Sequence, residues 1–325
     1  IYAMPFSHLK SVLTLSLLFT QNVLATAVDF SDYGPLRSYA QSPAQAGSLT
    51  PMLRSGFSLP EGQKELHLSA SAASVWAETD DYFADYYHNT LEGGLTWQVN
   101  DKWMIDTSYH WRFSGDNHLD SVTMWFHDAF GFSQNGREDA AKHQNQIFSK
   151  DAVNQQDISG ENLNNVVILY VGYQLFENQY QGLSLGGSLY YNYVDSGPFE
   201  DESFEQALQL NYSFRYEKHH VHSTAAVSFR QGNEVLSGIS YDNHAYSVNL
   251  GYEYLTGRHG WLLELHHYQG LLETENDFSK ASNEILLGYR YYLDTSAIEF
   301  SIVENYFNMD NSTDIAFNIG YRVKF

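Results

Sequence analysis

The sequence has no cysteine and, after its N-terminal region, no long apolar run. Without cysteine there is no disulfide framework. Without about 20 consecutive apolar residues, the chain is not a helical membrane protein. Basic residues are also scarce, with 17 Lys and Arg against 39 Asp and Glu. The resulting formal charge of −22 makes the chain a poor binder of nucleic acid, because phosphate repels it.

Aromatic residues, by contrast, are abundant. They make up 16% of the chain, with 25 tyrosines, although the mean hydropathy is only −0.39. A transmembrane β-barrel reconciles these values, because only alternate residues of each strand face lipid. The composition therefore predicts an all-β protein, an antiparallel up-and-down transmembrane barrel.

The N-terminus has the three-part layout of a secretory leader. Lys10 precedes an apolar stretch at 12–19 that is too short to span a bilayer, and small residues follow at Ala25 and Ala27. We expect a signal peptide over residues 1–27 with cleavage after Ala27, or alternatively after Ala25. A core helix is the competing interpretation of the same stretch.

Period-two alternation recurs along residues 64–325 and predicts a barrel of about twelve strands. One segment has Leu91, Leu95 and Trp97 on one face and Glu92, Thr96 and Gln98 on the other. Short and longer connections alternate, as antiparallel outer-membrane strands require. Short turns are expected at 100–101, 177–181, 217–220, 256–260 and 294–296, and longer loops at 77–88, 114–164, 195–203, 231–243, 273–280 and 308–312.

The last alternating segment ends at the C-terminus. Its apolar face consists of Ile319, Tyr321, Val323 and Phe325. An aromatic-rich last strand with a terminal Phe resembles the signal by which outer-membrane barrels are recognised for assembly. Closure against a first strand near residues 65–76 would leave no edge unpaired, as hydrocarbon demands.

Charged residues of both signs fall on the inward face of the predicted strands. The expected lumen charges are Arg112, Arg215, Arg290, Arg322, Asp106, Glu253, Glu264 and Glu299. Because isolated buried charges are costly, we expect ion pairs that bridge the lumen. Small inward residues indicate space inside, namely Gly94, Ser108, Gly186, Ser188, Gly251, Gly288 and Gly320; the inward Tyr190, Tyr268 and Tyr292 argue for a filled interior.

Two segments lack the strand pattern. Residues 28–63 contain four of the six prolines, which favours extended, turn-rich structure. This segment is expected to be a plug or periplasmic cap, or else a simple tether. In the external loop 114–164, Leu119, Val122, Phe126 and Ala129 have helical spacing, with Asp116 or Asn117 as N-cap and Gly131 at the end. This helix is expected to fold over or into the barrel mouth as a constriction.

These two segments carry a family resemblance. The motif "GPLRSYAQSP", the loop motif "FHDAFGFSQNGRED", the leader and the terminal Phe together resemble a family of uncharacterised proteobacterial outer-membrane proteins, known only as a domain of unknown function. The loop motif includes His127, Asp128, Gly131, Asn135, Gly136 and Arg137. The resemblance implies an outer-membrane barrel and supplies no catalytic residues.

An enzyme is not expected. A hydrolase needs a nucleophile, a base within hydrogen-bond reach and an orienting group. His127, Asp128 and Ser133 are local to one loop, and His222 and Ser223 point to opposite faces of a strand.

Neither a cofactor nor a metal site is expected. In the cluster His219, His220 and His222, only the last two share a strand face, and no well-spaced third ligand accompanies them. The acidic external runs are expected to be a solvated face, although oxygen-rich loops could hold divalent cations weakly.

We therefore predict an outer-membrane protein of a Gram-negative bacterium that is a narrow channel for small polar solutes. The alternative is a structural or surface-interaction barrel with a filled lumen. The expected partners are outer-membrane lipid, lipopolysaccharide and the barrel assembly machinery, with no nucleic acid.

Overall fold

The fold is a closed antiparallel barrel of twelve strands. The computed structural model describes residues 32–78, 82–131, 137–149, 153–231, 234–235, 239–273, 279–305, 307–308, 311 and 313–325. The predicted leader, with Ala25 and Ala27, lies outside the described residues, as do Ser133, Asn135 and Gly136 of the long loop. Within the described residues, neither α-helix is long and apolar enough to cross a membrane.

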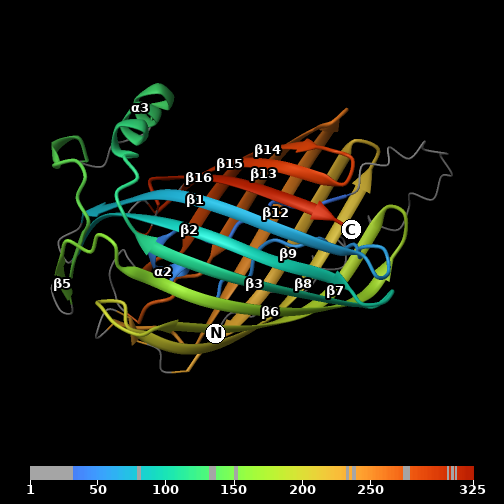
Figure 1. The fold of residues 1–325 in the computed structure, drawn as a ribbon, viewed down its shortest axis with the longest axis horizontal. Helices are drawn as coiled ribbons and strands as arrows, with labels where there is room; N and C mark the ends of the chain where they lie inside the picture. The colour runs from blue at the N-terminus through green and yellow to red at the C-terminus, as the bar shows by residue number, and fades with distance from the viewer. Residues whose placement is uncertain are drawn as a thin grey trace, which may run out of the picture.

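The barrel strands follow one another in chain order, each paired with its sequence neighbours. They are β1 (Lys64–Glu78), β2 (Tyr82–Gln98), β3 (Trp103–Ser114), β6 (Asn162–Glu177), β7 (Gln181–Val194), β8 (Asp201–Tyr216), β9 (His219–Phe229), β12 (His244–Thr256), β13 (His259–Tyr268), β14 (Ser282–Tyr292), β15 (Ser296–Asn305) and β16 (Ile315–Lys324). The sheet closes where β16 pairs with β1, from Glu65 opposite Lys324 to Ser74 opposite Ile315 (Figure 1). The predicted strand number and closure are confirmed.

Alternation sorts the side chains to the two faces of the wall. On β12 every second residue is buried, and the residues between them, such as Tyr246, Val248 and Leu250, are exposed on the outer face. At the C-terminus Ile319, Tyr321 and Phe325 are also exposed outward, with Phe325 at 67%. The barrel therefore has an apolar, aromatic exterior and a polar interior, which is the arrangement suited to a lipid solvent.

The connections define two ends of the barrel. Five short turns lie at one end, the short-turn end, together with the start of β1 and the C-terminus. The longer connections lie at the opposite, long-loop end. The predicted parity of loop lengths thus agrees with the structure at ten of the eleven connections, and the first is the exception.

The predicted loop at 77–88 is wrong. The first two strands continue into it and pair as far as Glu78 opposite Phe83. This outer part of β2 gains a second partner, because β4 (Gln146–Ser149) pairs with it from Tyr82 to Asp85 and β5 (Val153–Gln156) pairs with β4. A small hairpin of β10 (Glu234–Val235) and β11 (Ile239–Ser240) stands apart from this sheet.

The long loop forms its predicted helix, α3 (Asp120–Phe130), followed by a 3₁₀ turn, η1 (Arg137–Asp139). Gly131 ends α3 with φ of 72°, a left-handed conformation that glycine adopts without a Cβ clash. The predicted end at Gly131 is thus confirmed, but the predicted N-cap, Asp116 or Asn117, is wrong, because Leu119 is the N-cap residue. The side chain of Asn117 instead donates to the carbonyl oxygen of Ala73 at 3.1 Å.

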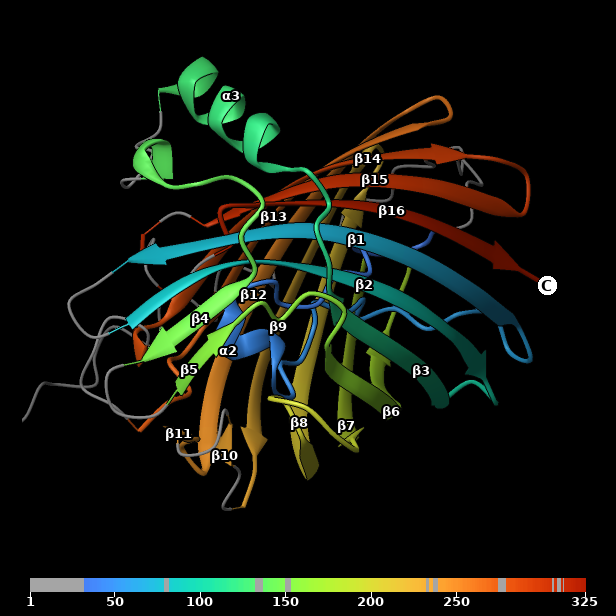
Figure 2. The same cartoon turned by 60° about the vertical axis from the view of Figure 1, so that its left-hand side comes forward.

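The predicted position of α3 over or inside the mouth is also wrong. Figure 2 shows α3 outside the barrel, above the wall formed by β15, β16 and β1, whereas the short helix α2 (Pro43–Ala46) lies inside. Helix α3 turns Asp120, Thr123 and His127 toward the protein and leaves Val122 and Trp125 exposed. Its polar face therefore packs and its apolar face does not.

Candidate functional site in the barrel lumen

Residues 32–63, which we call the lumen segment, lie inside the barrel as an open hairpin. At the short-turn end, Asp32 pairs with Arg215 at 3.4 Å. At the long-loop end the segment turns through α2, where the side chain of Gln45 donates to the carbonyl oxygen of Gln269. The segment then returns, and the amide of Ser58 donates to Glu177 at 3.0 Å near the short-turn end. It thus has an ascending arm (32–42) and a descending arm (47–63).

Proline explains why this segment forms no strand. Proline has no N–H for a sheet ladder and has a fixed φ, so Pro35, Pro43, Pro51 and Pro60 disfavour strand pairing. Pro43 instead stands at the start of α2, where its missing N–H is no loss, after Ser42 in an extended conformation. The backbone groups of the arms must therefore be satisfied by side chains of the wall.

Wall carboxylates accept hydrogen bonds from the ascending arm. The amide of Leu36 donates to Glu264 at 2.7 Å. The amides of Gln41 and Ser42 both donate to one oxygen of Glu284, at 2.7 and 2.9 Å. These two inward carboxylates thus bind main-chain amides. For Glu264, the sequence pattern had predicted an ion pair instead.

The descending arm is bound in the same manner by other strands. Glu205 accepts hydrogen bonds from the hydroxyl of Ser48 at 2.7 Å and from the amide of Leu49 at 3.0 Å. Further along, the amide of Arg54 donates to Thr224 at 3.1 Å, and that of Gly56 to Ser213 at 2.7 Å. Together the two arms contact most of the circumference of the wall.

Asp106 of β3 binds both arms at once. Arg37 of the ascending arm approaches its carboxylate at 2.9 Å, and Arg54 of the descending arm at 2.7 Å. Asp106 is only 2% exposed. Glu92 of β2 also lies 3.8 Å from the guanidinium of Arg37. The two arginines are the basic residues of the lumen segment. We call this group the Asp106 cluster.

Sequence reasoning missed Arg37 and Arg54. The signal that could have found them is their scarcity, because they are the two basic residues in a segment predicted to meet an acid-rich lumen. Predicted Asp106 is placed inward, but its partners come from the lumen segment and not from the opposite wall.

A second buried network lies within the wall. Arg290 pairs with Glu253 at 3.1 Å and with Glu299 at 2.7 Å, and Arg322 pairs with Glu299 at 3.3 Å. Arg322 also contacts Glu65 at 2.7 Å. These residues come from β12, β14, β15, β16 and β1, so the pairs run along one side of the wall. The expectation that ion pairs bridge the lumen is therefore wrong, because the lumen segment occupies the space between the walls.

This wall network also binds the lumen segment. The carbonyl oxygen of Pro35 accepts hydrogen bonds from Arg290 at 3.2 Å and from Arg322 at 3.1 Å. At the other end, Arg112 donates to the carbonyl oxygen of Ala46, the last residue of α2. All eight predicted lumen charges thus lie on the inner side, and six of them touch the segment directly: Arg112, Arg215, Arg290, Arg322, Asp106 and Glu264.

The small inward residues do leave room, and other groups occupy it. A Cβ at Gly288 would lie 2.6 Å from Leu36, and one at Gly251 would lie 2.6 Å from Leu53. The space at Gly186 is filled by the ring of Tyr170. At Gly182, a Cβ would lie 2.5 Å from the carbonyl oxygen of Gly56, so two backbones meet there without side chains between them. The inward Tyr190, Tyr268 and Tyr292 are all buried.

Cavities remain between the segment and the wall. One, of about 90 Å³, lies toward the short-turn end and is lined by residues that include Pro35, Arg54, Asp106, Arg215 and Arg322. Such a volume has room for a few waters, and the lining offers several hydrogen-bonding partners. The interior can therefore be hydrated while the segment is in place.

The described residues of the loop motif lie on the outer face of the wall. Arg137 is buried there and pairs with Asp120 at 2.5 Å, with Asp314, and more distantly with Asp85 at 3.9 Å. It also donates to the hydroxyl of Ser74 at 2.7 Å. Burial disfavours its charge, but the surrounding carboxylates raise the pKa of Arg137 above its ordinary value. We call this group the Arg137 cluster.

Two other motif residues complete this contact. His127 is buried and faces Glu304 of β15 at 3.5 Å, and Gly131 ends the helix. Asp128 is exposed. His222 points inward and bonds the hydroxyl of Ser213 at 2.7 Å, whereas Ser223 lies on the outer face, so the two residues considered in the sequence analysis do not meet.

The closed wall of twelve strands, with apolar exterior and polar interior, defines a β-barrel of the outer-membrane type. The model of the family described as "Protein of unknown function (DUF3187)" matches residues 11–325. The chain belongs to this family.

Solved structures agree with the fold. The COG4313 outer membrane channel from Pseudomonas putida F1 is 12% identical with a TM-score of 0.53, over 82% of this chain and 97% of that one. The KdgM porin in complex with disordered oligogalacturonate is 8% identical with a TM-score of 0.46, over 80% and 99% of the two chains. The NanC porin is 10% identical with a TM-score of 0.46, over 80% and 100%. A comparison with curated proteins finds no match.

Proposed function

We propose that this protein is a gated channel for small polar solutes in the outer membrane of a Gram-negative bacterium, with the lumen segment as its gate. Export would use the leader at residues 1–27. Lipid and lipopolysaccharide would surround the wall, and the assembly machinery would recognise Ile319, Tyr321, Val323 and Phe325. The fold of an outer-membrane channel supports this placement, and the polar inner face suits a path for polar solutes.

The observation that carries the proposal is the way in which the segment is held. Among the described residues, none of the lumen segment belongs to the sheet, which closes through β1 and β16 alone. Apart from Gly62 and Gln63, whose backbones bond that of Gln98 just before β1, its contacts run mainly to wall side chains, which water can replace as partners when the segment leaves. Release therefore requires breaking hydrogen bonds and ion pairs, and it leaves the barrel ladder intact.

The proposal includes the absence of catalysis. The hydrolase candidates do not gather: His127 and Asp128 stand on the outer loop, and His222 and Ser223 face opposite sides of β9. The solved structures reported above are channels and porins rather than enzymes.

A permanently filled barrel is the second candidate, and a specific observation favours it. The carbonyl oxygen of Pro35 accepts hydrogen bonds from both Arg290 and Arg322, which are themselves tied to buried carboxylates. Breaking such a desolvated contact is costly. If the segment never leaves, the function would lie in the external surface.

Planar-bilayer recording tests the two candidates. The mature protein is compared with a variant that lacks residues 28–63, and circular dichroism verifies the β-fold of both. The gated channel predicts infrequent openings in the mature protein and steady conductance in the variant. Steady conductance only in the variant, with a mature protein silent at every voltage, would favour the filled barrel. Silence in both folded proteins would contradict a channel.

A further inference from the structure

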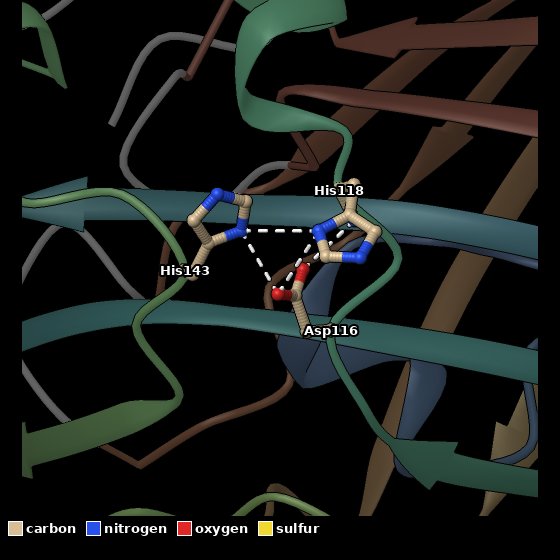
Figure 3. A group of neighbouring side chains, drawn as sticks. All are labelled: Asp116, His118 and His143. Carbon is tan, nitrogen blue, oxygen red and sulfur yellow. Dashed lines mark hydrogen bonds and ion pairs between the residues drawn. The ribbon is translucent and has the colours of Figure 1, made fainter.

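Three potential metal ligands converge at the base of the long loop, outside the barrel. Asp116 and His118 follow β3, and His143 precedes β4 (Figure 3). One carboxylate oxygen of Asp116 lies 3.2 Å from Nδ1 of His118 and 2.8 Å from Nδ1 of His143. The two Nδ1 atoms are 3.3 Å apart. Three ligand atoms of two residue types therefore form one small triangle.

The two ring nitrogens are difficult to satisfy by hydrogen bonds alone. A carboxylate only accepts hydrogen bonds, so each Nδ1 would have to carry a proton to bond Asp116. Two such N–H groups would then face each other at 3.3 Å. A cation resolves this conflict, because both nitrogens and the carboxylate can then direct lone pairs to one point. In that arrangement both imidazoles are neutral ligands.

Both histidines have an unusual backbone conformation, which supports a functional role for the triangle. His118 has φ of 58° and His143 has φ of 65°, a region that residues with a side chain rarely adopt. Of the four described non-glycine residues with positive φ, two are thus the ligands of this triangle. Strained backbone of this kind concentrates at sites with a function.

The dimensions identify the class of ion. Tetrahedral Zn²⁺ with bonds of about 2.0–2.1 Å requires ligand atoms about 3.3 Å apart. The observed edges of 2.8, 3.2 and 3.3 Å are close to this value. Two imidazoles and one carboxylate suit Zn²⁺ and its neighbours, whereas Ca²⁺ and Mg²⁺ prefer oxygen alone.

We propose that Asp116, His118 and His143 bind one Zn²⁺ ion, with water in the fourth position. The side chains are open to solvent, at 76% for His118 and 49% for His143, so that position is accessible. The ion joins the two ends of the segment that carries α3 and Arg137. The amide of His143 also donates to Asp120 at 2.8 Å, which connects the site to the Arg137 cluster. The ion therefore acts as a clip that holds the long loop against the wall. This inference does not depend on the channel function.

Cobalt titration of the folded, tag-free mature protein tests the site. Co²⁺ replaces Zn²⁺ and gives strong visible absorption bands only in tetrahedral sites. The variants are His118→Ala and His143→Ala, and the matched control is His244→Ala, which removes another exposed histidine at the long-loop end. We expect one tetrahedral equivalent in the parent and in the control, displaced by Zn²⁺, and at least about tenfold weaker binding in each ligand variant.

Trypsin cleavage after Lys142, which is exposed beside the site, gives a second measurement. Zn²⁺ should slow this cleavage in the parent and in His244→Ala, but not in His118→Ala or His143→Ala. The proposal is overturned if the parent shows no tetrahedral cobalt. It is equally overturned if His118→Ala and His143→Ala both bind Co²⁺ as the parent does, since the ion would then belong to another group, such as His219, His220 and His222.

Discussion

The lumen segment and the long loop dock on opposite faces of the same wall, and a buried charge cluster holds each of them. The two clusters differ in the sign of the central charge. Inside, one carboxylate, Asp106, binds two arginines of the lumen segment. Outside, one arginine, Arg137, is surrounded by three carboxylates. Each cluster is buried, and each joins a segment without strand pairing to the barrel. Neither segment is strongly apolar, so buried charge pairs decide where each segment docks.

The wall differs at the two docking places. Along β1 the outward residues change from the exposed Leu66 and Leu68 to the smaller Ser74, which the loop covers. Trp76 and Tyr87 are outward-facing on this part of β1 and β2, yet both are buried. Here the strands continue beyond the exposed apolar belt, so their outer face is free to bind protein. Inside the barrel, small residues provide the corresponding space.

The largest effect is expected when the Arg137 cluster is broken. In Arg137→Gln, three buried carboxylates lose their cation, which should weaken docking of the long loop by about 4 kcal/mol. Trypsin should then cleave after Lys142 much faster, while bilayer conductance stays at the parent level. The matched control is Arg258→Gln, which breaks an exposed pair with Asp294. Unchanged cleavage in Arg137→Gln would show that the cluster does not hold the loop.

The next largest effect is expected at the Asp106 cluster. Asp106→Asn removes the charge that holds both arms, so the lumen segment should be bound about 3 kcal/mol less tightly. The ratio of closed to open channels should fall by about two orders of magnitude, measured as open probability in planar bilayers. Asp294→Asn, at an exposed pair, should change this ratio little. If both variants gated like the parent, Asp106 would not be the residue that holds the lumen segment in place.

A smaller effect should follow from filling the contact between Gly56 and Gly182. Gly182→Val places a side chain against the descending arm and should weaken its seat by about 1–3 kcal/mol, through overpacking. Open probability should rise accordingly. The control is Gly187→Val on the same strand, where an added Cβ meets its nearest neighbour at an ordinary 3.6 Å. Equal behaviour of the two variants would contradict a close seat of the segment.

The smallest effect is the pH dependence of α3. Burial opposes the charge on His127, but its hydrogen bond to Glu304 and the charge of Asp314 raise the pKa of His127 above 6.5. Protonated His127 therefore stabilises docking fully below pH 6.5, and this contribution is lost as pH rises through the raised pKa. Cleavage after Lys142 should be slower at about pH 6 than at about pH 8. The difference should shrink in His127→Gln, once cleavage is normalised to trypsin activity at each pH, and burial, which raises the pKa of Asp314, would account for a remainder of the same sign. An undiminished difference would assign the pH dependence to a group other than His127.

The barrel itself could be predicted from the sequence because its signals are local. Alternation depends on neighbouring residues, and strand number follows from counting segments and loop parity. The error at 77–88 arose because acidic residues there suggest a loop. Asp85 is buried by Arg137 from a distant part of the chain, and β4 adds a partner to β2. Such a contact has no local signal.

The interior and the outer loop were less predictable for a related reason. Gly251 and Gly288 correctly indicated space, but the sequence does not state that Leu53 and Leu36 fill it. The spacing of Val122 and Phe126 predicted the helix α3, yet it suggested that the apolar face would pack. The polar face packs instead, since Asp120 and His127 find charged partners on the wall. Long-range charge pairing decided both outcomes.

The most direct test of the gate is a reversible lock on the lumen segment. Ser42 and Ser282 contact each other through their hydroxyls, and the chain has no cysteine, so Ser42→Cys with Ser282→Cys adds a single possible disulfide. We predict that the reduced double variant opens in planar bilayers, that oxidation abolishes the openings, and that reduction restores them, while each single variant is insensitive to oxidant. Equal conductance of the oxidised and reduced forms, with the disulfide verified by mass, would contradict the gate.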